Sequence, residues 1–275
     1  MIGILQEMFS YPFLARAMVV GTLVSLCAAL LGVTLVLKRY SMIGDGLSHV
    51  GFGALAVASA LHMEPLYVTI PVVVIAAFLL LRISENSAIK GDSAIAMISS
   101  GALAIGVTVT SVNGTNTDLS NYLFGSILSV SKTDEIVSIL IFFIVLAIYV
   151  LFYHRIFAIT FDEAFAKATG LHTQVYNIII ALLTAVTIVL GMRLMGTLLI
   201  SSLIIFPSLT SMRVFKRYSF VVLSSCVIAV VCFVFGMVLS YQYELPSGAS
   251  VVLVNMGMLL LFTAIGMVMT FGKKQ

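Results

Sequence analysis

The residues best suited to chemistry in this sequence are an aspartate and a histidine inside an apolar stretch. Asp45 lies within residues 41–61, whereas the rest of the eleven acidic residues fall in predicted loops or lead-ins. His49 follows four residues later, so both side chains share one helical face, with Ser48 at its edge. A carboxylate and an imidazole supply half of a site for Zn²⁺ or Mn²⁺. The same spacing also fits an Asp–His pair that only holds two helices together.

The composition places these residues in a membrane protein. Of the 275 residues, 61% are hydrophobic and 9% are charged, whereas a soluble domain carries about 25% charged residues. Most side chains must therefore face lipid or other apolar side chains. A net charge of +3 is too small to indicate a nucleic-acid partner. The three cysteines, Cys27, Cys226 and Cys232, lie in apolar runs, which favours small apolar packing over soft metal ligation.

Hydrophobic length predicts an all-α, polytopic protein with about nine transmembrane helices. A crossing needs about 20 mostly apolar residues, and nine stretches meet this: 13–37, 41–61, 65–81, 93–111, 136–153, 175–192, 194–212, 220–241 and 249–271. The shorter apolar stretch 122–130 predicts a re-entrant or surface helix. We expect residues 1–275 to form one transmembrane domain.

The basic residues predict the orientation in the membrane. With nine crossings, three basic residues lie on one side, namely Arg16, Lys132 and Arg193. The other eleven lie on the opposite side: Lys38, Arg39, Arg82, Lys90, Arg155, Lys167, Arg213, Lys216, Arg217, Lys273 and Lys274. The positive-inside rule places the larger group in the cytoplasm. We therefore expect a multi-pass protein of the cell membrane with its N-terminus outside and its C-terminus in the cytoplasm.

The depth of the Asp–His pair follows from this topology. A helix that starts near Ser41 places His49 about 12 Å from the cytoplasmic edge, because an α-helix rises about 1.5 Å per residue. That position is close to the midplane of the bilayer. Ionisable residues at such depth are costly and mark a transport pathway or site.

The longest cytoplasmic loop, residues 156–174, has the features of a docking element. Asp162 (or Thr160) is a candidate cap of a short helix, Glu163 suits its first turn, and Gly170 can end it. Phe161 and Phe165 are four residues apart and are predicted to project from one face toward a partner's groove. The alternative is a helix that lies on the membrane surface. The sequence has no Gly-Lys-Ser or Gly-Lys-Thr loop, so any ATP hydrolysis belongs to another subunit.

The stretch 194–212 contains Pro207. Proline removes one backbone donor and clashes with the preceding turn, so we expect it to interrupt or bend this span and to mark a gate.

Four stretches together resemble the permease subunits of ABC importers for zinc, manganese and iron. They are VLKR at 36–39 running into SMIGDGLSH at 41–49, YLFGSIL at 122–128, FDEAFA at 161–166, and GTLL through IIFP at 196–207 with PSG at 246–248. The resemblance covers nearly the whole chain, and its most specific motif is the Gly-Asp-x-x-Ser-His segment.

The resemblance implies a type II ABC importer permease that works with several partners. Two permease copies form the pathway, cytoplasmic ATPase subunits dock on coupling helices that include residues 161–166, and an extracytoplasmic protein delivers the metal. Asp45 and His49 match family positions implicated in the metal pathway, and the metal is cargo, not a permanent cofactor. Some manganese-type members add an acid and a histidine in a later helix. The span 220–241 has neither, which favours zinc over manganese or iron.

Two other classes of protein fit parts of the pattern. A proton-coupled secondary transporter would use Asp45 and His49 as a proton relay and work without an ATPase. Such transporters carry internal repeats, and the two halves of this sequence show no such symmetry. An intramembrane metalloenzyme needs a closed ligand set such as His-Glu-x-x-His, which this sequence lacks.

Overall fold

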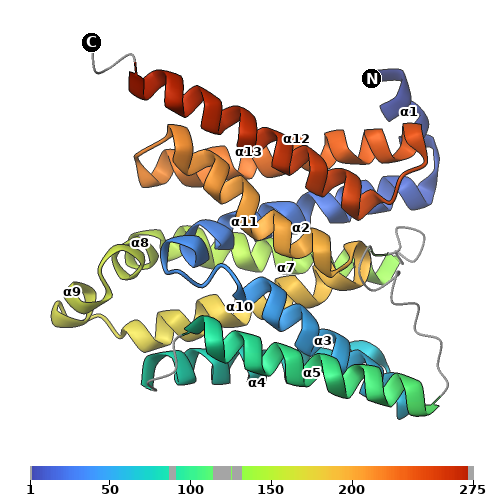
Figure 1. The fold of residues 1–275 in the computed structure, drawn as a ribbon, viewed down its shortest axis with the longest axis horizontal. Coiled ribbons are helices and arrows are strands. Elements are labelled where there is room, and N and C mark those ends of the chain that lie inside the picture. The colour runs from blue at the N-terminus through green and yellow to red at the C-terminus, as the bar shows by residue number, and fades with distance from the viewer. Residues whose placement is uncertain (1, 87–90, 114–124, 126–131, 272–275) are drawn as a thin grey trace.

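The computed structural model describes residues 2–86, 91–113, 125 and 132–271. Twelve helices occupy these residues, and no strand occurs among them. The long helices run roughly along one direction, as Figure 1 shows. The twelve are α1 (Ile2–Ser10), α2 (Pro12–Leu37), α3 (Ile43–Ala60), α4 (Pro65–Asn86), α5 (Gly91–Asn113), α7 (Lys132–Leu151), α8 (Tyr153–Phe161), α9 (Glu163–Ala168), α10 (Thr173–Met195), α11 (Thr197–Val214), α12 (Tyr218–Tyr243) and α13 (Ser247–Phe271).

Nine of these helices coincide with the nine predicted spans. Within the described residues, six helices are long and apolar enough to cross a membrane, namely α2, α5, α10, α11, α12 and α13. A seventh crossing is added if α7 and α8, which meet at an angle of 72°, count as one broken span. The other two predicted spans are α3, which carries polar Asp45 and His49, and α4, whose apolar part is Tyr67–Leu80.

Several basic residues lie at one end of the bundle. The end that holds α8 and α9 also holds the C-terminal ends of α2, α4 and α11, so the basic residues Lys38, Arg82, Arg155 and Arg213 gather there (Figure 1). α5 ends and α7 begins at the opposite end, as nine crossings require. The stretch 122–130, predicted as a re-entrant or surface helix, lies outside the described residues except for Gly125.

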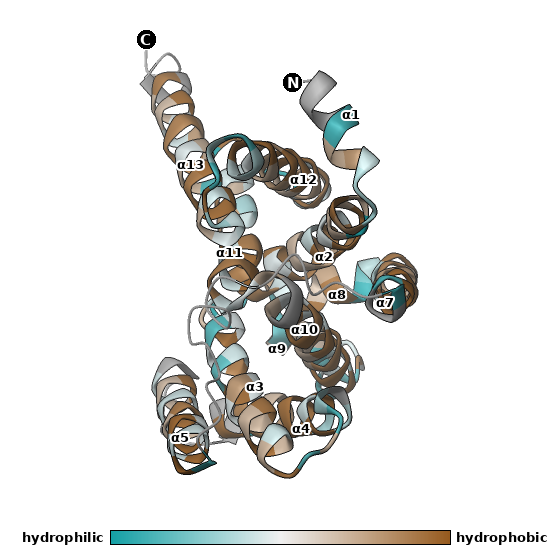
Figure 2. Cartoon of the chain, turned by 90° about the vertical axis from the view of Figure 1, so that its right-hand side faces the viewer, coloured by the Kyte–Doolittle hydropathy of each residue, from teal (hydrophilic) through white to brown (hydrophobic). Residues whose placement is uncertain are grey.

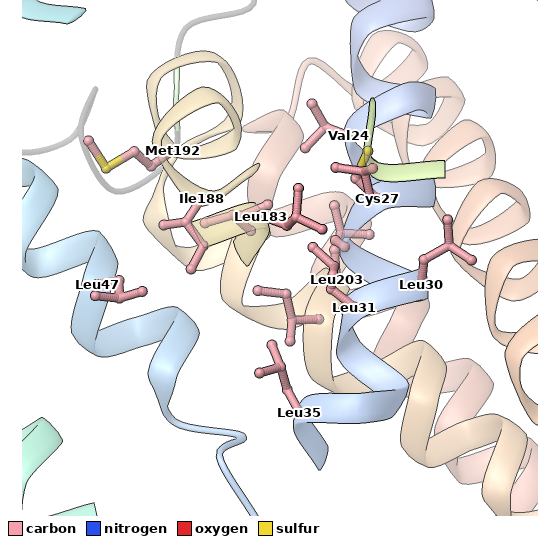
Figure 3. Packing of buried hydrophobic residues seen from close by; sticks show 14 of the residues in the cluster. Val24, Cys27, Leu30, Leu31, Leu35, Leu47, Leu183, Ile188, Met192 and Leu203 are labelled. Carbon is pink, nitrogen blue, oxygen red and sulfur yellow. The ribbon is translucent and has the colours of Figure 1, made fainter. Parts of the chain in front are cut away.

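α2 is the central helix. It packs against α7, α10, α11 and α12, while α3, α4 and α5 form one side and α13 lies on the other (Figure 2). Figure 3 shows side chains of α2, including Cys27 and Leu31, against Leu183 and Ile188 of α10 and Leu203 of α11. The peripheral helices α5 and α13 instead expose apolar side chains such as Ile105 and Leu260. This distribution is that of a bundle whose outer surface faces lipid.

The cysteines are placed as the sequence predicted. All three are free, Cys27 and Cys232 are buried, and Cys226 is partly buried. They fill space among apolar side chains.

A glycine separates α10 from α11. Gly196 has φ 84° and ψ 162°, a region that residues with a Cβ rarely enter. The sequence predicted the division between these two spans at Arg193, three residues before the break. It sets the direction of α11 and thereby the side of α11 that meets α3.

Candidate metal pathway and coupling site

The Asp–His pair lies on one face of α3, as predicted. His49 Nε2 is 3.6 Å from Asp45 Oδ2, and the two side chains are 20% and 45% exposed, respectively. Two ligands of a tetrahedral zinc ion lie about 3.4 Å apart, given bond lengths of about 2.1 Å. The spacing therefore fits two donors of one ion. Within the described residues, no group of three or more His, Cys, Asp or Glu side chains is close enough to hold a metal.

The pair is less deep along its helix than predicted. α3 begins at Ile43, not near Ser41, because residues 38–42 form the turn from α2. His49 is therefore about 9 Å from the helix start, at about 1.5 Å per residue. Asp45 lies in the first turn of α3, where the positive end of the helix dipole stabilises a carboxylate. The helix starts two residues later than expected because the turn takes more of the chain than assumed, and the position of the pair near the midplane stays a prediction.

Ser48 is completely buried. Its hydroxyl donates to the carbonyl oxygen of Asp45 at 2.7 Å. This hydrogen bond lies within the helix turn that joins Asp45 to His49. A role of Ser48 as a metal ligand stays a prediction.

The glycines around the pair allow close helix contact. A Cβ placed on Gly44 would lie 3.0 Å from Ile204 Cδ1 of α11, and one on Gly53 would lie 2.6 Å from the carbonyl oxygen of Ala102 in α5. Small residues at these positions let the helices approach closely. Through Gly44, the first turn of α3 touches α11 one turn before Pro207.

α11 is not interrupted at Pro207. The helix continues from Thr197 to Val214 with the proline inside it, so the predicted interruption does not occur. Neighbouring helices and hydroxyl groups make such prolines tolerable in membrane helices. Beside the proline, the Ser208 hydroxyl donates to the carbonyl oxygen of Ile204 at 3.1 Å. The role of Pro207 as a gate stays a prediction.

The loop at residues 156–174, predicted to be cytoplasmic, forms two helices rather than one. Asp162 has extended backbone (φ −147°, ψ 93°) and caps α9 by accepting a hydrogen bond from the Phe165 amide at 2.8 Å. Gly170, with φ 87°, ends α9: its amide donates to Lys167 and the Leu171 amide donates to Ala166. The cap and the stop match the prediction.

The two phenylalanines do not share a helix. Phe161 is the last residue of α8 and Phe165 lies in α9, so their spacing of four does not put them on one helical face. Both rings are exposed, Phe161 by 59% and Phe165 by 65%. The ring of Phe161 also contacts Phe157 and Tyr218, with centroids 4.8 and 5.9 Å apart. The expected common face was wrong because Asp162 breaks the helix between them.

A polar network joins α2, α9 and α10, and it was not predicted from the sequence. Lys38 Nζ lies 3.0 Å from Glu163 Oε2 and also donates to Asn177 Oδ1. Asn177 Nδ2 donates to the other carboxylate oxygen of Glu163 at 2.7 Å. The Lys38 side chain is 8% exposed. One signal in the sequence could have indicated it: Asn177 is a polar residue inside the apolar stretch 175–192, and Lys38 follows the first predicted span.

The chain matches one transport family along most of its length. The profile of the ABC 3 transport family matches residues 10–266. The manganese transport system membrane protein MntC of Halalkalibacterium halodurans is 30% identical over 250 residues, which cover 90% of this chain and 86% of that one. The high-affinity zinc uptake system membrane protein ZnuB of Haemophilus influenzae is 30% identical over 244 residues, which cover 88% of this chain and 94% of that one.

A solved structure has the same fold. The chain resembles PsaBC from Streptococcus pneumoniae, determined in complex with Fab, with a TM-score of 0.84 and 28% identity over 95% of both chains. The arrangement of helices described above is therefore that of an ABC transporter membrane subunit. With a family match over nearly its whole length and a relative at 30% identity, the chain belongs to the ABC 3 transport family.

Proposed function

We propose that this chain is the permease subunit of an ABC importer for a divalent transition metal, with zinc as its main cargo. The observation that carries the proposal is the Asp45–His49 pair, whose donor atoms are 3.6 Å apart on one face of α3. Both side chains are partly exposed, which supports access of an incoming ion to the pair.

The two donors have distinct tasks in transport. The carboxylate of Asp45 partly neutralises the charge of the dication, which lowers the cost of leaving water. The neutral imidazole of His49 supplies a directional nitrogen ligand. Because a transported ion must also be released, a site of two protein donors completed by water suits transport better than a closed cage.

The choice of zinc rests on the ligand types. α12 (Tyr218–Tyr243) has no histidine and no acidic residue, so it offers no carboxylate, a donor that suits manganese. The relatives are named for manganese, zinc and iron at similar identity, from 28% to 30%. Manganese and iron are the alternative outcomes of the transport test below.

The proposed partners are those of an ABC importer. The pathway requires two copies of the chain, an extracytoplasmic protein delivers the metal, and a cytoplasmic ATPase subunit docks at α9. Phe165 supports this docking site, because an aromatic ring exposed by 65% at the end of the bundle is suited to a partner's groove. The basic residues at the same end support its cytoplasmic location.

The test is metal uptake by proteoliposomes that contain the permease and its ATPase. We expect uptake of radioactive zinc to require ATP, and excess unlabelled zinc to compete better than manganese or iron. Stronger competition by manganese would reassign the cargo and retain the importer. Uptake that follows a proton gradient and proceeds without ATP or the ATPase would contradict the proposal and favour a secondary transporter.

A further inference from the structure

We propose that Lys38 is a positioning residue that links the ATPase-docking helix α9 to the start of α3, where the metal pair lies. This inference rests on the proposed function, because it names the contact by which movement of α9 reaches the pathway.

The first step of the argument is the burial of a charge. Lys38 is 8% exposed and has two partners, Glu163 of α9 and Asn177 of α10. Glu163 is 41% exposed and accepts from both. A buried ammonium group needs such partners, because leaving it unpaired costs more than breaking an exposed ion pair. Glu163 is therefore directed at the bundle, and the exposed face of α9 is left to Phe165 and its neighbours.

The second step is the short, hydrogen-bonded turn after Lys38. The amide of Arg39 donates to Val36, and the amide of Tyr40 donates to Leu35 at 2.8 Å. Arg39 has φ 62°, a left-handed conformation that is costly for a residue with a side chain. The amide of Ile43 then donates to Tyr40, which starts α3. A displacement of Lys38 is transmitted through this turn to α3.

The third step is the short distance along the chain to the metal pair. Lys38 and Asp45 are seven residues apart, and Asp45 lies in the first turn of α3. The same turn of α3 packs against α11 through Gly44. A shift of α9 is therefore expected to change the position of Asp45 relative to α11.

The link is distinct from ordinary anchoring of α9. α8, which precedes α9, is already held by the aromatic cluster of Tyr218, Phe157 and Phe161. Loss of the Lys38 contact should leave this cluster and the docking face in place. We therefore expect a Lys38 variant to bind the ATPase normally but to couple ATP hydrolysis poorly to metal import.

The first measurement is amide hydrogen exchange in the purified permease alone, comparing wild type with Lys38→Met. Methionine keeps the apolar stem and removes the charge. We expect the amide exchange rate to rise by at least about tenfold in residues 163–171 and also in residues 39–47. A tenfold rise corresponds to a fall of about 1.4 kcal/mol in the free energy of local opening. A rise confined to 163–171, or no rise in either segment, would overturn the link, and this readout does not depend on transport.

The second measurement is the amount of metal imported per ATP hydrolysed by the reconstituted complex. We expect Lys38→Met to lower this ratio by at least about fivefold, as residues in coupling networks do, while the ATPase still co-purifies. The double variant Lys38→Glu with Glu163→Lys should recover most of the ratio. Lys216→Gln, which removes an exposed lysine from the α11–α12 turn, is the matched control and should change nothing.

An unchanged ratio in Lys38→Met would contradict the proposal, as would a fall that matches a loss of bound ATPase. If the wild-type complex hydrolyses ATP but imports no metal, the proposed function fails. The exchange data then still decide whether Lys38 links α9 to α3.

Discussion

At the scale of single residues, the two donors of the proposed metal site are held by different parts of α3. Asp45 lies in the first turn, whereas His49 lies one turn further and is more buried, at 20% exposed. Ser48 completes the turn by donating to the Asp45 carbonyl oxygen. The helical backbone therefore sets the spacing of the two donors.

The position of Ser48 predicts a mild phenotype for Ser48→Ala. A serine that bonds to the carbonyl three residues earlier contributes about 1 kcal/mol or less to stability. We expect zinc uptake to stay within about threefold of wild type, which corresponds to less than 1 kcal/mol. Uptake as low as that of His49→Ala would instead identify Ser48 as a ligand.

The sequence predicted the pair but not the residue at which its helix begins. The spacing of four residues was enough to place Asp45 and His49 together, because helical periodicity determines which side chains meet. The start of α3 could not be predicted, because no proline or glycine between Lys38 and Ile43 marks it. The contacts of Lys38 could not be predicted, because Glu163 and Asn177 are far from it in the sequence.

At the scale of elements, the two phenylalanines of the coupling region have separable roles. Phe165 is 65% exposed, whereas Phe161 also packs on Phe157 and Tyr218. We expect Phe165→Ala to weaken ATPase binding by at least about tenfold, in the range of interface hot spots. Phe161→Ala should also lower the melting temperature of the permease. Co-purification and thermal unfolding of both variants measure this difference, and unchanged binding in both would refute docking at α9.

The contact between α3 and α5 provides a second test at this scale. A Cβ on Gly53 would lie 2.6 Å from a backbone oxygen of α5, which cannot move aside like a side chain. We expect Gly53→Ala to destabilise the permease by about 1–3 kcal/mol, the usual cost of overpacking.

Gly101→Ala is the matched control on the facing helix. No atom lies within 4 Å of its added Cβ, so this change should be neutral or stabilising by up to about 1 kcal/mol. Equal melting temperatures for the two variants in detergent would contradict close packing of α3 on α5.

Helix positions were predictable because the apolar stretches are long and end in polar residues. Breaks within the helices were harder to predict. Asp162 was identified as a cap, yet the apolar run before it also formed a helix, α8, so one expected helix became two. Pro207 was expected to interrupt α11, but the helix continues through it because tertiary packing outweighs the local preference of proline.

At the scale of the whole molecule, the basic end of the bundle predicts the orientation. We expect a cysteine at Lys216, in the turn between α11 and α12, to react with a membrane-impermeant thiol reagent only from the cytoplasmic side. A cysteine at Glu64, in the turn between α3 and α4, should react only from outside. The native cysteines are buried or partly buried, so we expect little background labelling from them. Reversed labelling would contradict the orientation and place α9 outside the cell.

The central claim is that a metal ion passes Asp45 and His49, and one measurement tests it most directly. It is ATP-dependent uptake of radioactive zinc at limiting concentration by Asp45→Asn, compared with wild type at matched expression and melting temperature. Asparagine keeps the shape of the side chain and removes its charge, so uptake should fall by at least about tenfold, which corresponds to 1.4 kcal/mol. Glu244→Gln, which neutralises an exposed acid after α12, should leave uptake unchanged. Uptake by Asp45→Asn close to the wild-type value would show that Asp45 only holds α3 in place and would contradict the account.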